Sequence, residues 1–236
     1  MKKFFILLLS CLFVFSCCGT TNYNFDQSPK NKLDVHDLYN SVAKVSITTK
    51  DGSGTLIGTA FAVDEDYLLT AAHVCVGIYE IALLGMADLD EIKLTFLNQE
   101  QQKLYYYKQV QIVDIDEDFD LCLLKRKNHK LTPVQFGEYS KLKIGDKVMV
   151  LGAPQGVFPV LTEGRVIIFN GAGILPTYYK RGLLTISAPV SGGNSGGPVF
   201  DEQGRLVGVL VMGLISYHHC NFATGLDMIN KFLGRK

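Results

Sequence analysis

The sequence predicts an all-β fold, and two observations support this prediction. From residue 41 onward the chain consists of short apolar runs of β type separated by turn residues, and helix signals are few. Runs of this length and spacing are typical of a β-sandwich or a β-barrel. The 236 residues suit one large or two small domains, and β-barrels often reach this length as one unit.

The expected strands follow one another along the whole folded part. The first, over 42–47, alternates apolar and polar residues and ends at the turn Asp51-Gly52-Ser53-Gly54. The others are apolar runs bounded by turn residues, at 56–63, 67–70, 92–96, 105–113, 121–124, 147–152, 161–168, 183–187 and 206–212.

Helix signals occur in three places. Residues 71–74 fit a single helical turn, and residues 76–89 fit either a short helix or a structured loop. Asp227 is a suitable N-cap for a final helix, whose apolar side chains are Met228, Ile229, Phe232 and Leu233.

The N-terminal residues resemble an export signal. Two lysines precede an apolar run over 4–15, which has the length of a signal-peptide core rather than of a membrane span. The sequence ending in Ser16-Cys17 resembles a bacterial lipobox with Cys17 as the lipidated residue, and the alternative is ordinary cleavage near Cys18 or Gly19. We therefore expect a lipoprotein-type signal peptide over 1–17 and a polar tether over 18–34. The mature protein is then held in the bacterial cell envelope or secreted, outside the cytoplasm.

Charge and cysteine spacing exclude several function classes. The 23 basic and 23 acidic residues balance, which argues against a nucleic-acid partner and against an electrostatic membrane patch. The cysteines have no zinc-binding spacing; Cys75 and Cys122 are expected to be two buried thiols, although one unassigned disulfide is compatible with the sequence. His218-His219-Cys220 could be taken for a set of metal ligands, but the side chains of neighbouring residues on a strand point to opposite faces. A loop beside a pocket is therefore expected there instead of a metal site. We expect no metal and no cofactor.

The most informative stretch is SGGNSGGPV at 191–199. It holds Ser195 among glycines, which allow backbone angles and close approaches that other residues resist. A serine held in this way has an exposed hydroxyl, and two or three backbone N–H groups can point to one place beside it, which suits a nucleophile next to an oxyanion hole. Taken alone, the stretch also fits a tight loop with an incidental serine.

A serine nucleophile needs a base, and the base needs an acid to orient it. His73 follows an apolar strand and two alanines, a position that suits a core histidine equally well. Asp120 directly precedes the apolar run 121–124, where a shielded carboxylate interacts strongly with an imidazole. We favour Asp120 over Asp118, which lies in the exposed acidic loop.

Four motifs occur in a fixed order: GTAFAV at 58–63, LLTAAH at 68–73, DLCLLK at 120–125 and GNSGGP at 193–198. Together they resemble the trypsin-like serine peptidases of the chymotrypsin fold, above all the protease domain of the HtrA/Deg group. Shorter matches agree with this resemblance, at 144–146, 150–156, 161–166 and 222–223. The resemblance extends from about residue 42 to residue 233.

The resemblance implies two packed six-stranded β-barrels with a short C-terminal helix. The protease domain is expected over 35–236, with halves near 35–135 and 136–236. His73, Asp120 and Ser195 are expected to form a catalytic triad in the cleft between the halves. The backbone N–H groups of Gly193 and Ser195 are expected to bind the oxyanion.

Two departures from the family pattern carry expectations of their own. Asn194 stands where the pancreatic enzymes carry an aspartate that pairs with a new N-terminal amine, so we expect no activation by N-terminal cleavage. The sequence ends at Lys236, which leaves no room for the PDZ domain usual in the HtrA/Deg group. We therefore expect a monomer or a small oligomer.

The substrate pocket is expected to be small and apolar. The strand at 208–213 should flank the substrate's P1 side chain, and it lacks both the hydroxyl and the histidine that related enzymes offer there. The residues expected around this pocket are Pro189, Val190, Leu210, Met212 and Cys220. We therefore expect a preference for aliphatic P1 residues such as valine, alanine or leucine.

The leading function hypothesis is an exported, lipid-anchored serine endopeptidase that acts on unfolded or envelope polypeptides. One alternative is a catalytically silent binding or chaperone-like module on the same fold. Another is a narrowly specific processing protease with the same triad.

Overall fold

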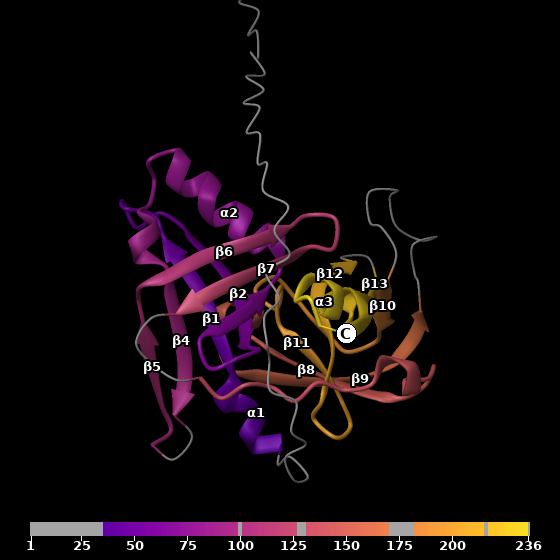
Figure 1. Ribbon diagram of the computed structural model, residues 1–236. Coiled ribbons are helices and arrows are strands. Elements are labelled where there is room, and N and C mark those ends of the chain that lie inside the picture. The colour runs from indigo at the N-terminus through magenta and orange to yellow at the C-terminus, as the bar shows by residue number, and fades with distance from the viewer. Residues whose placement is uncertain (1–34, 99–100, 127–130, 170–181, 215–216, 236) are drawn as a thin grey trace, which may run out of the picture.

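The computed structural model describes residues 35–98, 101–126, 131–169, 182–214 and 217–235. Figure 1 shows two β-structured halves side by side, with the earlier strands in one half and the later strands in the other. The expected signal peptide and tether over 1–34, with Cys17, lie outside the described residues. In the part that is described, no helix has both the length and the apolar character needed to span a membrane.

The first half is a seven-stranded sheet with the order β5-β4-β1-β2-β3-β7-β6. All of its neighbouring strands pair antiparallel. Its elements, in chain order, are α1 (Val35–Ser41), β1 (Val42–Thr48), β2 (Thr55–Ala62), β3 (Tyr67–Thr70), α2 (Ala72–Leu83), the 3₁₀ turn η1 (Leu89–Glu91), β4 (Lys93–Asn98), β5 (Lys103–Tyr107), β6 (Val110–Asp116) and β7 (Leu121–Arg126).

The second half is a closed barrel with the order β10-β13-β12-β11-β8-β9. A short helix, α3, follows its last strand (Figure 1). The elements are η2 (Tyr139–Lys141), β8 (Lys147–Gly152), η3 (Pro154–Gly156), β9 (Val160–Phe169), β10 (Leu183–Ile186), β11 (Pro198–Asp201), β12 (Leu206–Leu214), β13 (Tyr217–Gly225) and α3 (Leu226–Phe232).

The expected all-β fold in two halves with a C-terminal helix is confirmed, and the first half differs in detail. It has seven strands instead of six, and among the described residues no pairing joins β5 to β6 to close it. The expected strand at 105–113 divides into β5 and β6, because Gln109 between them has a φ of 68°, which is incompatible with a strand. The strands β11 and β13 were not among those predicted.

The helices also differ from the prediction. The uncertain region after His73 is one helix of 12 residues, α2, which turns Val74, Cys75 and Ile78 toward the core. The expectation that Asp227 caps α3 is wrong, because the N-cap is Gly225 and Asp227 lies inside the first turn. No side chain caps α3, and the Gly225 N–H donates to the Gly182 carbonyl, which continues the pairing of β13 with β10.

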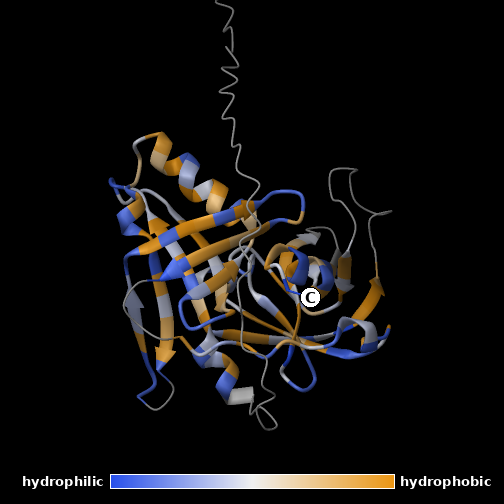
Figure 2. Ribbon diagram, in the orientation of Figure 1, coloured by the Kyte–Doolittle hydropathy of each residue, from blue (hydrophilic) through white to orange (hydrophobic). Residues whose placement is uncertain are grey.

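Three clusters of buried apolar side chains hold the fold together, and Figure 2 shows the hydrophobic residues along the strands and the hydrophilic ones in many of the connections. One cluster lies mainly in the first half and one lies in the second half. The remaining cluster joins residues of both halves, including Phe61, Leu69 and Leu121 from the first and Leu151 and Phe200 from the second. Burial of this shared cluster fixes the two halves against each other.

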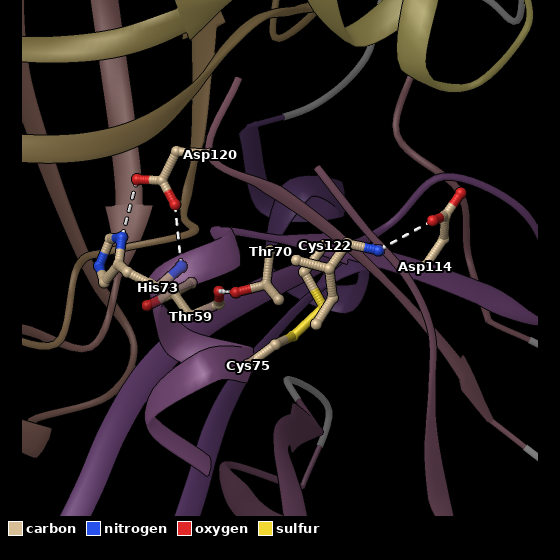
Figure 3. Close-up of a disulfide and its surroundings, with 8 residues drawn as sticks. Thr59, Thr70, His73, Cys75, Asp114, Asp120 and Cys122 are labelled. Carbon is tan, nitrogen blue, oxygen red and sulfur yellow. Dashed lines mark hydrogen bonds and ion pairs between the residues drawn. A yellow bond between two sulfur atoms is a disulfide. The ribbon is translucent and has the colours of Figure 1, made fainter. Parts of the chain in front are cut away.

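A disulfide joins Cys75 on α2 to Cys122 on β7 (Figure 3). The expectation of two free buried thiols is therefore wrong. The helix packs against β7, which brings two cysteines that are 47 residues apart in sequence to a Cα–Cα distance of 6.6 Å. Each cysteine lies two residues after His73 or Asp120, so the bridge ties together the segments that carry these two side chains.

Removing this disulfide should destabilise the protein. The bridge spans 47 residues, and the chain-entropy argument for such a loop gives about 4 kcal/mol of lost unfolding free energy. Urea denaturation of the Cys75→Ala/Cys122→Ala variant, without reductant, measures the loss. Cys220→Ala is the matched control, because Cys220 is a free thiol. A double variant as stable as the oxidised wild type would contradict the prediction.

Candidate active site

His73 and Asp120 are held together by two hydrogen bonds (Figure 3). The backbone N–H of His73 donates to Asp120 Oδ1 at 2.9 Å, and His73 Nδ1 lies 2.8 Å from Asp120 Oδ2. A carboxylate only accepts hydrogen bonds, so Nδ1 carries the hydrogen and Nε2 of the neutral ring keeps its lone pair. The imidazole is therefore oriented as a base with Nε2 available.

The two side chains of this pair differ in their exposure to solvent. The Asp120 side chain is 12% exposed, whereas the His73 side chain is 47% exposed. Asp120 adopts a left-handed backbone conformation with a φ of 53°, which aspartate tolerates better than most residues. This conformation lies at the start of β7, where the chain turns into a buried strand. A shielded carboxylate thus holds an imidazole that is half open to solvent.

The loop with Ser195 packs closely against the segment just before His73. The Ser195 carbonyl accepts a hydrogen bond of 2.8 Å from the Thr59 N–H on β2. A Cβ on Gly196, which has a φ of 82°, would collide with Thr70 Oγ1 and with the Thr59 carbonyl, so only glycine fits. The described residues include no hydrogen bond between Ser195 Oγ and His73. Such a contact is often long without substrate and tightens in the complex.

The backbone N–H groups of Gly193 and Ser195 are available to a ligand. Neither of them donates to any group in the described part of the chain. The Gly192 carbonyl accepts from the Gln155 N–H at 2.7 Å, and the Asn194 carbonyl accepts from the Gly197 N–H at 2.9 Å. Because a trans peptide points its N–H opposite to its carbonyl, both N–H groups point away from these partners. This is the behaviour expected of oxyanion-hole donors.

The five expected pocket residues differ in burial and in the groups that they contact. Leu210 is buried, and its backbone pairs with the serine loop. Its N–H donates to the Gly197 carbonyl, and its carbonyl accepts from the Gly196 N–H. Val190 is half-buried and borders Gly213. Pro189 is exposed. Met212 and Cys220 pack at the edge of the core cluster of the first half.

Asn221 is a pocket candidate that the sequence reasoning missed. Its side chain is buried, and Nδ2 donates to the Ala188 carbonyl at 2.7 Å, directly before Pro189. Its Oδ1 lies 2.8 Å from the position that a Cβ on Gly213 would take, and Val190 lies 3.1 Å from the same point. The signal available in the sequence was a polar residue within an apolar part of β13, because Asn221 directly precedes Phe222 and Ala223. Its amide adds a polar group to a region that was expected to be apolar.

A cavity of about 600 Å³ lies elsewhere, beside α2 and β6. It contains none of the expected site residues, and only two of its lining residues are titratable, so it offers no nucleophile with a base. Its lining residues are Tyr79, Leu89, Asp90, Ile92, Gln109, Val110, Gln111 and Ile112. Among the described residues, no three side chains of the metal-ligating types gather at one point, and the side chain of His218 lies outside this description.

Comparison with known proteins assigns the family. The family model of the trypsin-like peptidase domain matches residues 58–209, which include His73, Asp120 and Ser195. The chain belongs to the trypsin-like peptidase family. This membership confirms the expected resemblance and the expected enzyme class, a serine peptidase of the trypsin-like type.

The relatives agree with an HtrA/Deg-like protease domain. A probable periplasmic serine endoprotease, DegP-like, of Pseudomonas putida is 30% identical over 154 residues, which are 65% of this chain and 28% of the relative. A DegP-like protein of Chlamydia pneumoniae is 28% identical over 180 residues, which are 75% of this chain and 33% of the relative. The chain thus spans about a third or less of the length of these curated relatives.

Solved structures show the same fold. The HtrA-type protease AlgW with a tripeptide superposes with a TM-score of 0.67 at 22% identity, and the alignment covers 85% of this chain and 61% of that one. The crystal structure of Deg5 gives a TM-score of 0.65 at 22% identity and covers 85% of this chain and 95% of that one.

Gly196 provides a test of the close approach that this trypsin-like domain needs. Gly196→Ala combines a left-handed φ with a collision against Thr70 and Thr59, whereas Gly52→Ala has a similar φ of 72° and nothing within 4 Å. The control should lose about 1–2 kcal/mol of unfolding free energy. Gly196→Ala should lose about 1–3 kcal/mol more through overpacking. Urea denaturation of both variants gives the difference, and equal losses would mean that the loop does not pack as described.

Asp120→Asn tests the two-point hold on His73. The amide has nearly the same shape and tolerates the left-handed backbone, but its Nδ2 cannot accept a hydrogen bond and favours the wrong imidazole tautomer. We expect kcat to fall by about 10⁴ with little change in folding. Peptidase assays and thermal unfolding measure the two effects. Asp118→Asn is the matched control and should keep full activity; an equal loss in both variants would contradict the assignment.

Proposed function

We propose that the protein is an exported serine endopeptidase that hydrolyses peptide bonds through an acyl-enzyme on Ser195. The observation that carries the proposal is the two-point hydrogen bonding of Asp120 to His73, beside a serine loop that packs against the same segment. Membership in the trypsin-like peptidase family supports the same chemistry.

Acylation begins when Ser195 Oγ attacks the carbonyl carbon of the scissile bond. His73 Nε2 takes the hydroxyl proton as the new C–O bond forms, and Asp120 stabilises the resulting imidazolium. The negative charge that develops on the substrate oxygen is met by the N–H groups of Gly193 and Ser195, which lack other partners in the described residues. His73 then returns the proton to the leaving amine as the C–N bond breaks.

Deacylation repeats these steps with water as the nucleophile. His73 takes a proton from the attacking water, and the oxyanion is bound by the same two N–H groups. The ester bond to Ser195 then breaks, and His73 returns the proton to Ser195 Oγ. The free acid leaves and the enzyme regains its starting state. Every proton is carried by this chain's own side chains, so the reaction needs no cofactor.

The substrates are proposed to be unfolded or envelope polypeptides cut after aliphatic residues. Relatives named periplasmic serine endoproteases support a location outside the cytoplasm. The apolar side chains of Val190 and Leu210 beside the serine loop support an aliphatic P1 residue. The lipid anchor on Cys17, the domain limits 35–236 and the monomeric or small oligomeric state belong to the same proposal. Activity without cleavage of a propeptide to create a new N-terminal amine does too, because Asn194 carries no charge to pair with such an amine.

Labelling with a fluorophosphonate probe tests the catalytic serine. The folded wild type should be labelled and should digest casein, and Ser195→Ala should lose both, with kcat reduced by at least about 10⁴. Ser191→Ala is the matched control, since Ser191 lies in the same loop and should leave labelling intact. A folded wild type that neither reacts nor cleaves would instead favour a silent binding module. Mapping of the cleaved casein bonds reports the P1 residue, and cuts mainly after glutamate or arginine would refute the aliphatic preference.

A further inference from the structure

Thr59 on β2 is a buried residue whose hydroxyl connects two loops of the second half. Its side chain is fully buried. Thr59 Oγ1 donates to the Gly193 carbonyl at 2.8 Å and accepts from the Ala153 N–H at 3.1 Å. A hydroxyl has one hydrogen to donate, and the carbonyl and the N–H fix which role it plays toward each partner. Both partners lie far away in sequence, 134 and 94 residues from Thr59.

The backbone of Thr59 contacts the catalytic elements as well. Its N–H donates to the Ser195 carbonyl at 2.8 Å. Its carbonyl accepts a 2.7 Å hydrogen bond from Thr70 Oγ1, three residues before His73 (Figure 3). One residue of the first half therefore contacts the serine loop, the segment that leads to the base and the turn at Ala153.

Gly193 has a φ of 97°, and the peptides on both sides of it are held by hydrogen bonds. The peptide that follows Gly193 is held through its carbonyl by Thr59 Oγ1. The peptide that precedes it is held through the Gly192 carbonyl by Gln155 N–H, in the turn that Ala153 begins and that the same hydroxyl binds. Glycine has no Cβ to restrict its own rotation. The direction of the Gly193 N–H therefore depends on these two hydrogen-bonded peptides.

We propose that Thr59 is a positioning residue of the oxyanion hole: its hydroxyl sets the orientation of the Gly193 N–H without touching the substrate. This inference rests on the proposed serine-peptidase function and adds to it a residue that acts on transition-state binding. The developing oxyanion is bound by Gly193, whereas the ground-state peptide is bound mainly by other contacts. Loss of the hydroxyl should therefore lower kcat far more than it raises KM.

Thr59→Val, which is nearly isosteric, removes the hydroxyl and tests the proposal. With a p-nitroanilide peptide taken from a mapped casein cleavage site, we expect kcat to fall by about 10–100-fold, less than the 10²–10³ typical of removing a donor outright, and KM to change by less than about threefold. The rate of fluorophosphonate labelling should fall in parallel. Thr59→Ser keeps the hydroxyl and should restore kcat to within about threefold of the wild type.

Thr185→Val is the matched control. Thr185 is also fully buried, on β10 of the barrel, but its hydroxyl has no hydrogen-bond partner in the described structure. The control should therefore fold and keep kcat unchanged. Thr59→Ala is the second hydroxyl-free variant, with space for the loop to relax if valine prevents folding.

The outcomes separate the inference from the function on which it rests. A wild type without Ser195-dependent labelling or cleavage would overturn the proposed function. An active wild type with equally active Thr59→Val or Thr59→Ala would overturn the positioning role alone. A loss seen only in KM, or equally in Thr59→Ser, would also overturn it. Unfolding of both hydroxyl-free variants, with Thr59→Ser and Thr185→Val folded, would overturn it in favour of a purely structural role.

Discussion

The hydrogen bonding between the Asp120 carboxylate and His73 is the constraint on which the rest of the site depends. One carboxylate oxygen fixes the backbone of His73 and the other fixes the tautomer of its ring. The pair needs α2 and β7 to stay at a constant separation, and the Cys75–Cys122 disulfide joins these same elements two residues further along each. The His73 imidazole is therefore oriented by a short, covalently closed frame within the first half.

The serine comes from the other half, so the site also depends on how closely two backbones approach. Glycine at 196 makes room for Thr70 and for the Thr59 carbonyl. The apolar cluster shared by Phe61, Leu121 and Phe200 holds the halves together at this distance. The Thr59 hydroxyl holds the peptide after Gly193 directly, and it binds the turn at Ala153, from which the Gln155 N–H holds the peptide before Gly193. Apolar packing therefore brings the two backbones close together, and hydrogen bonds orient the peptides of the serine loop.

Much of the fold and site was predictable because the signals are local. The glycines around Ser195, the alanines before His73 and the apolar run after Asp120 each lie within a few residues of the group that they present. Where prediction failed, the pairing of distant strands or a local backbone conformation decided. Asp227 has the right chemistry for a cap, but α3 begins at Leu226 with Gly225 as its N-cap, directly after β13 pairs with β10. The break at Gln109 likewise depends on a backbone conformation that residue type alone does not specify.

The sequence by itself determined the fold class, most of the strands, the family and the residue types available for catalysis, because hydrophobic periodicity and short motifs depend on neighbouring residues. Only the tertiary structure decided the open seven-stranded sheet, the pairing of Cys75 with Cys122, and the partners of Thr59 and Asn221. These features join residues that are tens to more than a hundred positions apart. Such partners are chosen by the packing of the whole chain, since a buried polar group takes whichever donor or acceptor the fold brings within reach.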